Sequence, residues 1–156
     1  MLAWRIAVDT LTYAADDLSG NGAKATGGRW NSRGQAMLYC ASSIALAALE
    51  TVVHLGAAGL PLNRYLVRID IPDAVWDSRE ELSHLTAPVG WDALPAGRVS
   101  VDLGDSWLAQ GASPLLAVPS IVVPEEQNIL VNPRHPEAAL ISATKLRKWL
   151  YDPRLL

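Results

Sequence analysis

The sequence predicts an α+β fold with mixed, mostly antiparallel sheets of short strands and few helices. Short apolar stretches recur along the chain, which is typical of strands, and only one long stretch has the composition of a helix. The predicted strands and helices do not alternate regularly, so a doubly wound parallel sheet is disfavoured. Because the chain has 156 residues, we expect a single domain over residues 1–156.

Five strands are expected, each where apolar residues form a short run or alternate with polar ones. In chain order they are residues 2–8, 35–41, 64–71, 114–123 and 127–133. Prolines border the last two stretches and mark their ends. The C-terminal residues 143–156 are compatible with either a strand or a helix.

The clearest helix is expected at residues 44–59, which are rich in alanine and leucine and end in glycines. Ser42 or Ser43 can cap its N-terminus by accepting a hydrogen bond from a backbone N–H. Two shorter helices are expected within residues 77–85 and 104–111.

Composition and charge argue against several classes of protein. Half of the residues are hydrophobic and 19% are charged, which disfavours disorder, and the net charge of −3 disfavours nucleic acid as the main partner. The first residues do not form a signal peptide and no run of 18 apolar residues occurs, so we expect a cytoplasmic protein without a membrane span. The single cysteine, Cys40, is expected to be a buried, inert thiol.

The glycine-rich stretch "GNGAKATGGRWNSRG", residues 20–34, partly fits two nucleotide-binding motifs. Its beginning fits the pattern G-x-G-x-x-A of dinucleotide-binding loops, but that motif must open a helix, which Gly27 and Gly28 disfavour. A P-loop is excluded because Gly28 stands where the lysine is required. A flexible turn between two strands is the alternative, and the context alone favours it slightly.

Arg29 argues against a plain turn. A guanidinium can bind a phosphate with two parallel hydrogen bonds, and the preceding Gly28 lets a ligand approach the backbone. A surface arginine or a buried ion pair would explain the residue equally well.

Glu50 is the only acidic or basic residue, histidine aside, in the apolar stretch 44–55. A helix that is apolar on all sides is largely buried, and a buried carboxylate is costly unless it is paired or hydrogen-bonded. Glu50 is therefore either a structural residue, at a rim or in a salt bridge, or a functional carboxylate that meets a positive charge. With His54 it could bind a metal, but no further ligands have suitable spacing, so no metal site is expected.

Tyr39 ends the strand that precedes this helix. Arg29, Tyr39 and Glu50 thus come from a loop, a strand end and a helix, and together they could surround one pocket. Each also has an ordinary structural role: a surface cation, a core tyrosine and a glutamate at a rim.

The second half of the chain carries polar residues within apolar stretches. Ser120 can cap or satisfy the backbone, and Asn128 and Asn132 are typical of turns. A catalytic triad of Ser120, His135 and an aspartate is disfavoured because the chain has no G-x-S-x-G motif.

Taken together and in this order, these residues resemble the RES domain, the toxin of bacterial toxin–antitoxin modules with an Xre-like antitoxin. The resemblance covers nearly the whole chain, through "WRIA", "LSGNGA", "GGRWNSRG", "LYCASSIALAALETVVH", "VPSIVVPEEQNILVNPRHP" and "DPRL". Its most specific parts are "GGRWN" and "NILVNPRHP", whereas residues 72–112 carry little family signal.

The resemblance implies an enzyme that consumes NAD+ on a fold similar to that of ADP-ribosyltransferase toxins. By motif position, it implies a catalytic trio of Arg29, Tyr39 and Glu50. Arg29 would bind the pyrophosphate, Tyr39 would stack on the nicotinamide or its ribose, and Glu50 would stabilise the oxocarbenium ion.

The remaining NAD+-binding residues implied by the resemblance are Gly28, Ser120 and Asn128. The ADP-ribose would pass to a protein, to phosphate or to water, and the sequence leaves these acceptors open. A cognate Xre-like antitoxin that covers the active site is the expected partner. The alternative from a different class is a non-catalytic module that binds a nucleotide or a partner protein.

Overall fold

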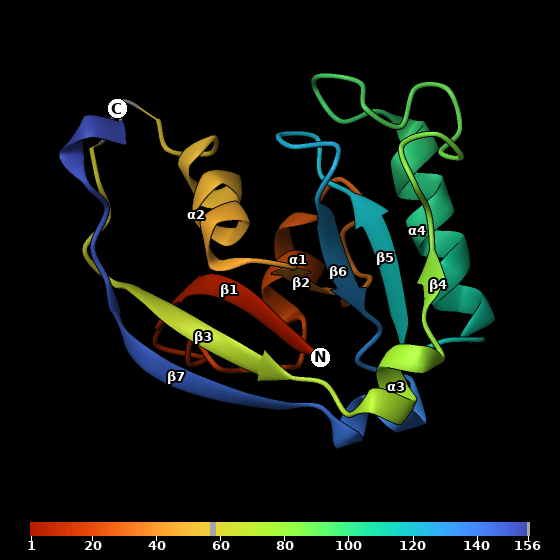
Figure 1. Ribbon diagram of the computed structural model, residues 1–156, viewed down its shortest axis with the longest axis horizontal. Coiled ribbons are helices and arrows are strands. Elements are labelled where there is room, and N and C mark those ends of the chain that lie inside the picture. The colour runs from red at the N-terminus through yellow and green to blue at the C-terminus, as the bar shows by residue number, and fades with distance from the viewer. Residues whose placement is uncertain (57–58, 156) are drawn as a thin grey trace.

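A seven-stranded sheet with the strand order β4-β5-β6-β2-β1-β3-β7 forms the centre of the molecule (Figure 1). The structure is a computed structural model that describes residues 1–56 and 59–155. Its strands are β1 (Leu2–Val8), β2 (Leu38–Ala41), β3 (Arg64–Asp70), β4 (Glu80–Glu81), β5 (Leu115–Pro119), β6 (Gln127–Val131) and β7 (Ser142–Trp149). All neighbouring strands are antiparallel except β4 and β5, so the predicted α+β class is confirmed.

The described residues also form four α-helices and two short 3-10 helices. They are α1 (Asn21–Thr26), α2 (Ile44–Val52), α3 (Asp73–Asp77), α4 (Arg98–Gln110), η1 (Pro136–Leu140) and η2 (Pro153–Leu155). None of these helices is both long and apolar enough to cross a membrane.

The five predicted strands are confirmed as β1, β2, β3, β5 and β6, with ends that shift by a few residues. The strand predicted at 114–123 is shortened because the chain turns at Ser120, whose hydroxyl accepts hydrogen bonds from two backbone N–H groups. The C-terminal stretch 143–156 forms most of β7 and then η2, and residue 156 lies outside the described residues.

The helix predicted at residues 44–59 is confirmed only in its first part, α2. Ser43 is its N-cap, and the Ser43 hydroxyl accepts a hydrogen bond from the N–H of Leu46 at 3.1 Å. The helix ends at Val52, among β-branched residues that lower helix propensity. Residues 57–58 of the predicted helix lie outside the described residues.

The helix predicted within residues 77–85 is wrong. A helix forms earlier, as α3 directly after Pro72, and the two glutamates that follow it form β4. β4 pairs with β5 at the edge of the sheet, where the exposed strand keeps both charged side chains in water. The helix predicted at 104–111 is confirmed within α4, which begins earlier, at Arg98.

The two faces of the sheet are covered differently. One face carries a core cluster that includes Leu38, Cys40, Val67, Ile69, Leu115, Ala117, Ile129 and Val131. On the other face, the strand register places Ala41, Asn128 and Val118 next to one another on β2, β6 and β5. α2 packs over β1 on this face, and α4 packs over β5 and β6, so the middle of the face lies between the two helices (Figure 1).

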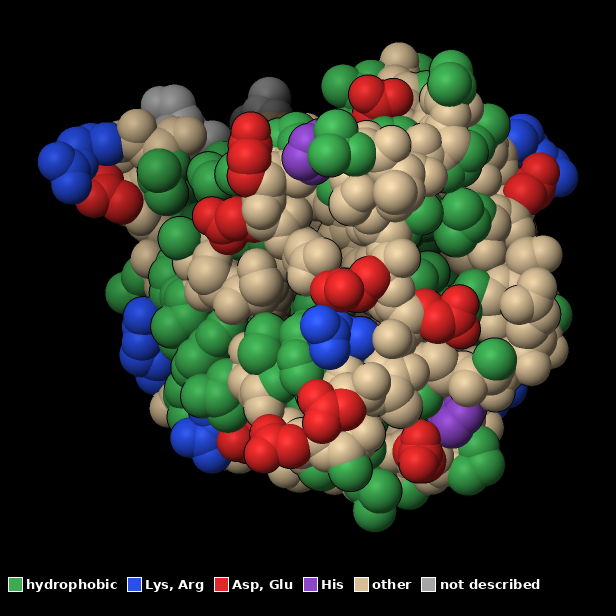
Figure 2. Space-filling view, turned by 45° about the vertical axis from the view of Figure 1, so that its right-hand side comes forward, with side chains coloured by type: hydrophobic (Ala, Val, Ile, Leu, Met, Phe, Trp, Pro, Cys, Tyr) green, Lys and Arg blue, Asp and Glu red, His purple; other side chains and the backbone are tan. Residues whose placement is uncertain are grey.

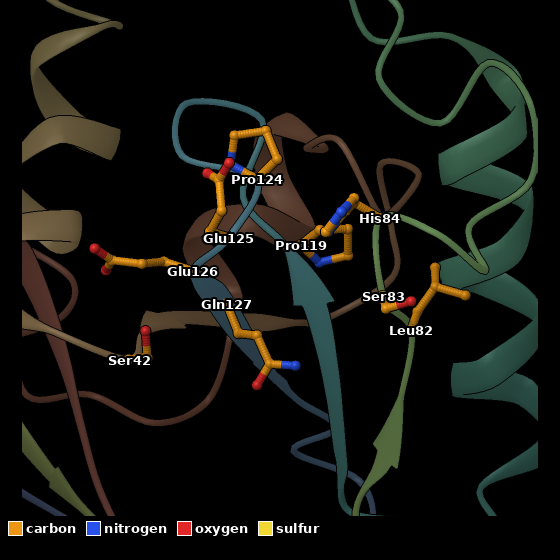
Figure 3. A pocket seen from close by; sticks show the side chains of 9 residues that line it. All are labelled: Ser42, Leu82, Ser83, His84, Pro119, Pro124, Glu125, Glu126 and Gln127. Carbon is orange, nitrogen blue, oxygen red and sulfur yellow. The ribbon is translucent and has the colours of Figure 1, made fainter.

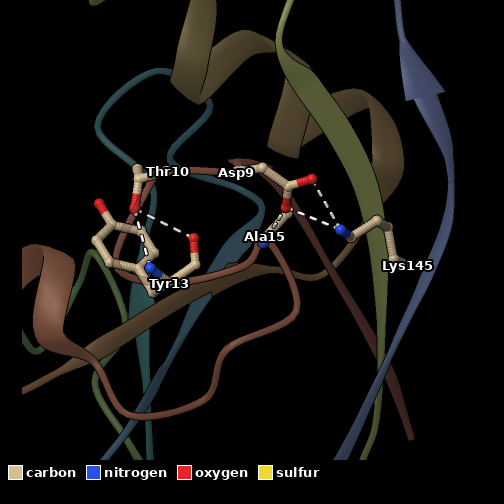
Figure 4. Close-up of polar contacts among 5 residues, drawn as sticks. All are labelled: Asp9, Thr10, Tyr13, Ala15 and Lys145. Atoms are coloured by element: carbon tan, nitrogen blue, oxygen red, sulfur yellow. Dashed lines mark hydrogen bonds and ion pairs between the residues drawn. The ribbon is translucent and has the colours of Figure 1, made fainter.

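An ion pair between Asp9 and Lys145 connects the segment after β1 with β7 (Figure 4). The ammonium of Lys145 contacts both carboxylate oxygens of Asp9 at 2.8 and 2.9 Å, and the N–H of Ala15 donates to Asp9 at 2.7 Å. The hydroxyl of Thr10 accepts from the N–H of Tyr13 at 3.0 Å and donates to its carbonyl at 3.1 Å. These contacts order the connection between β1 and the glycine-rich stretch.

Cys40 lies in β2 with 4% of its surface exposed. Burial raises the pKa of its thiol to about 11, and the thiolate is the reactive form of cysteine. The predicted buried thiol is therefore confirmed, and its chemistry is suppressed at neutral pH.

Candidate functional site

The glycine-rich stretch folds as a short helix followed by a tight turn. The expectation that it contains no helix is wrong, because α1 fits between Gly20 and Gly27, which both take positive φ values of 71° and 72°. A side chain at Gly20 would lie 2.7 Å from the backbone nitrogen of Met37, so close packing requires this glycine. α1 has only six residues and does not follow a strand directly, so the dinucleotide fingerprint remains excluded.

Arg29 lies in the turn after α1 and is half-buried. Its Nη1 donates hydrogen bonds to the carbonyls of Trp91 and Ala93, both at 3.0 Å. Burial lowers the pKa of the guanidinium below its ordinary value, whereas the nearby charges of Glu50 and Asp92 act in the opposite direction. Because no described residue accepts a hydrogen bond from Nε or Nη2, these donors could bind an anionic ligand.

The hydroxyl of Tyr39 forms two hydrogen bonds with residues of the same turn. It donates to Oδ1 of Asn31 at 2.6 Å and accepts from the N–H of Trp30 at 3.0 Å. Burial raises the pKa of the phenol well above its ordinary value, so Tyr39 stays neutral. A Cβ atom at Gly28 would lie 2.7 Å from the Tyr39 hydroxyl, so only glycine fits at this position directly before Arg29.

Glu50 projects from α2 as a half-buried carboxylate. The expectation that this helix is largely buried is wrong, since only Leu46 and Ala47 of α2 are buried. Glu50 nevertheless has two specific partners: its Oε1 accepts hydrogen bonds from the Ser120 hydroxyl at 2.7 Å and from Nδ2 of Asn128 at 2.6 Å. These bonds fix the orientation of the carboxylate, and no donor among the described residues reaches Oε2.

Ser120 satisfies the backbone, as considered from the sequence, and it also contacts Glu50. It is fully buried, and its hydroxyl accepts from two backbone N–H groups in the turn after β5 while it donates to Glu50. The disfavoured triad is not formed, because His135 caps η1 instead. Asn128 lies within β6 rather than in a turn, whereas Asn132 does order a turn by accepting from the N–H of Arg134 at 3.1 Å.

The predicted residues therefore form two hydrogen-bonded groups on one face of the sheet. Glu50 with Ser120 and Asn128 forms the first group, and Tyr39 holds the turn that carries Arg29 in the second. Both groups belong to the face that α2 and α4 share. Across residues 1–56 and 59–155, no group of three or more His, Cys, Asp or Glu side chains is placed to hold a metal ion.

A hollow of about 310 Å³ lies next to the first group, between the segment that follows β4 and the turn from β5 to β6 (Figure 3). Its lining residues are Ser42, Leu82, Ser83, His84, Pro119, Pro124, Glu125, Glu126 and Gln127. Two of them directly precede Ser120 and Asn128 in the chain, but none of the predicted site residues lines the hollow. The carboxylate of Glu126, one of the lining residues, already accepts a hydrogen bond from the hydroxyl of Ser43 at 3.0 Å.

Charges are mixed on the face of the molecule shown in Figure 2, where acidic side chains lie among apolar and basic ones. No broad basic area covers this face, in keeping with the net charge of −3. A nucleic-acid backbone would need a basic stripe or patch.

Three residues near the site were not among the predicted site residues. Asn31 is buried and bonds to Tyr39, and Asp105 of α4 accepts hydrogen bonds from both the N–H and the hydroxyl of Ser32. The third is Trp91, whose carbonyl accepts from Arg29 and whose ring stacks on the ring of Trp30 with centroids 6.2 Å apart. The position of Asn31, directly after the Arg-Trp pair, was the one available signal.

The chain is similar to known proteins over nearly its whole length. A family model described as the RES domain matches residues 2–153. The chain is 61% identical over 153 residues to a protein of Sphingobium sp. (strain YBL2) named Prs ADP-ribosylating toxin, across 98% of this chain and 95% of the relative. It is 37% identical over 156 residues to a protein of Yersinia enterocolitica named Toxin Res, across 99% of each chain. A protein of Pseudomonas putida, also named Toxin Res, is 39% identical over 140 residues, across 88% of each chain.

Proposed function

Because the chain belongs to the RES-domain toxins, we propose that it cleaves the nicotinamide–ribose bond of NAD+ and transfers the ADP-ribose to a protein. The observation that carries this proposal is the carboxylate of Glu50, held by Ser120 and Asn128 on the same sheet face as the Arg29 turn. A fixed carboxylate beside a half-buried cation suits a substrate that combines a pyrophosphate with a cationic leaving group.

Glu50 is proposed to stabilise the transition state. When the bond from ribose C1′ to the nicotinamide nitrogen breaks, both bonding electrons leave with the nicotinamide, which becomes neutral and needs no proton. The positive charge moves to the ribose as an oxocarbenium ion, and a carboxylate that is already oriented stabilises it without reorganisation. Oε2, which accepts no hydrogen bond from the described residues, is the oxygen available to the ribose.

Arg29 is proposed to bind the pyrophosphate. Its Nη1 is occupied by two backbone carbonyls, which leaves Nε and Nη2 for a phosphate oxygen. The backbone of Gly28, whose missing side chain makes room for the Tyr39 hydroxyl, is proposed to contact the phosphate as well. The ring of Tyr39, rather than its hydroxyl, is proposed to contact the nicotinamide or its ribose, because the hydroxyl is bonded on both sides.

A protein acceptor is favoured over phosphate or water by the name of the Sphingobium relative. In that reaction a nucleophilic side chain of the acceptor forms the new bond to C1′ and loses a proton, so the products are nicotinamide, a proton and the modified protein. We propose Prs as the first acceptor to test. A cognate Xre-like antitoxin that covers the site is proposed as the partner that keeps the toxin inactive.

NAD+ labelled in its adenine moiety tests the proposal and separates the acceptors. The purified chain is incubated with labelled NAD+ alone, with phosphate, with purified Prs and with cell lysate. Nicotinamide release together with a labelled Prs band supports the proposal, whereas release with label only in small molecules indicates phosphorolysis or hydrolysis. No release under any condition contradicts NAD+ cleavage, and a Glu50→Gln variant that still inhibits growth would favour a non-catalytic module.

A further inference from the structure

Asn31 is the most extensively hydrogen-bonded side chain near the proposed site. The residue is 1% exposed. Its Nδ2 lies within hydrogen-bonding distance of three backbone carbonyls, those of Ala23 at 2.9 Å, Gln35 at 3.0 Å and Ser32 at 3.2 Å. Its Oδ1 accepts from the hydroxyl of Tyr39 at 2.6 Å. One amide group thus joins α1, the turn after it and β2.

Asn31 fixes the backbone on both sides of Arg29, through its own carbonyl on one side and through its side-chain amide on the other. On one side, the N–H of Gly28 donates to the carbonyl of Asn31 at 3.0 Å and closes the turn. On the other side, the N–H of Trp30 donates to the hydroxyl of Tyr39, which Asn31 holds in place. Arg29 lies between two fixed peptide groups, while its own side chain reaches away to the carbonyls of Trp91 and Ala93.

We propose that Asn31 is a positioning residue that sets the Arg29 guanidinium for binding the pyrophosphate of NAD+. This inference rests on the proposed function and adds a residue that acts through Arg29 and Tyr39 without touching the substrate. Asparagine suits the position because one face of its amide donates and the other accepts. Aspartate would turn a carboxylate toward the three carbonyls. A buried apolar residue would remove the partner of the Gln35 carbonyl and the acceptor of the Tyr39 hydroxyl proton, whereas the carbonyls of Ala23 and Ser32 would keep the N–H groups of Gly27 and Gln35.

A purely structural role makes a different prediction from a positioning role. If Asn31 only stabilises the fold, its loss lowers the fraction of active protein and therefore kcat, but leaves the KM for NAD+ unchanged. If Asn31 positions Arg29, its loss raises KM. Asn132 provides a matched control, because it is a buried asparagine with backbone partners that does not contact the Arg29 turn.

The test compares the wild type with Asn31→Ala, Arg29→Ala, the double variant and Asn132→Ala, by the kinetics of nicotinamide release. Asn31→Ala is expected to raise KM roughly tenfold or more, because it misplaces a charge-assisted contact. The double variant is expected to have the KM of Arg29→Ala alone, and Asn132→Ala the KM of the wild type. An unchanged KM in Asn31→Ala, or effects that multiply in the double variant, would overturn the proposal.

Two further measurements cover the cases in which Asn31→Ala does not fold or the wild type releases no nicotinamide. If Asn31→Ala does not fold, Tyr39→Phe replaces it, since this change breaks the same contact, keeps the ring and is also expected to raise KM. If the wild type releases no nicotinamide, the proposed function fails, and the same variants are compared by calorimetric titration with NAD+. Weaker binding in Asn31→Ala then supports positioning, equal binding overturns it, and a wild type that does not bind NAD+ overturns both proposals.

Discussion

Replacing Gly104 by alanine tests how tightly α4 holds the turn that carries Arg29. Gly104 lies within α4, and a Cβ atom built on it would be 1.8 Å from the carbonyl oxygen of Trp30 and 2.7 Å from its carbonyl carbon. Both of these atoms belong to the backbone, so no rotation of a side chain can relieve the collision. The helix and the turn would have to separate by about 1.6 Å to restore ordinary van der Waals contact at 3.4 Å.

Two opposing effects determine how much Gly104→Ala changes the free energy of unfolding. Alanine in a helix interior stabilises the helix by about 1 kcal/mol relative to glycine, so helix propensity alone predicts a more stable protein. Overpacking against a rigid neighbour costs about 3 kcal/mol at the upper end of its usual range. We therefore expect Gly104→Ala to lower the free energy of unfolding by about 2 kcal/mol, which corresponds to a fall in Tm of about 4–8 °C in a domain of this size.

Chemical and thermal unfolding followed by circular dichroism measure this change. Ser106→Ala is the matched control, because it also places alanine in α4 but at an exposed position, and its stability is expected to stay within about 0.5 kcal/mol of the wild type. A Gly104→Ala protein as stable as the wild type, or more stable, would refute the close contact between α4 and the turn.

Three further predictions address the scaffold around the site. Ser43→Ala removes the N-cap of α2 and should cost about 1 kcal/mol in chemical unfolding, whereas Ser42→Ala should cost clearly less; equal losses would contradict the assignment of the cap. The thiol of Cys40, with its pKa raised to about 11, should react with a thiol reagent at pH 8 only after unfolding, and rapid labelling of the native protein would contradict its burial. Hydrogen bonding to Lys145 lowers the pKa of Asp9 in the folded state, so its contribution to stability is present above the unfolded value near pH 4 and is lost as the pH falls through the folded value. The stability difference between wild type and Asp9→Asn should therefore be constant above about pH 5 and shrink below about pH 4, and a constant difference down to pH 2 would exclude the ion pair.

The parts of the fold that depend on local pattern could be predicted from the sequence. The apolar runs that became β1, β3 and β6 identified these strands, and a serine before an alanine-rich stretch identified the start of α2. Elements set by distant partners could not be predicted. β4 exists because two glutamates pair with β5 at an edge, although their local sequence favours a helix equally well.

In the candidate site, too, the sequence indicated individual residues but not the distant contacts that hold them. Residue types and family resemblance selected Arg29, Tyr39 and Glu50. The structure places Arg29 in a turn to which the Tyr39 hydroxyl of β2 is hydrogen-bonded, and it gives Glu50 its own partners. The contacts that fix them come from far along the chain. The carbonyl of Trp91, 62 positions from Arg29, and the Asp105 carboxylate, 73 positions from Ser32, lie in a region without recognisable motifs.

The rate of nicotinamide release by Glu50→Gln tests the central claim most directly. Glutamine retains an oxygen that can accept from Ser120 and Asn128 but removes the negative charge, so the fold and the geometry should persist while stabilisation of the oxocarbenium ion is lost. Glu137→Gln serves as the control, because this exposed glutamate lies on η1, outside both groups of the site. The account predicts that the wild type and Glu137→Gln cleave NAD+ at the same rate and that kcat of Glu50→Gln falls by at least about 100-fold with an unchanged circular dichroism spectrum. A folded Glu50→Gln protein that releases nicotinamide at the wild-type rate would contradict it.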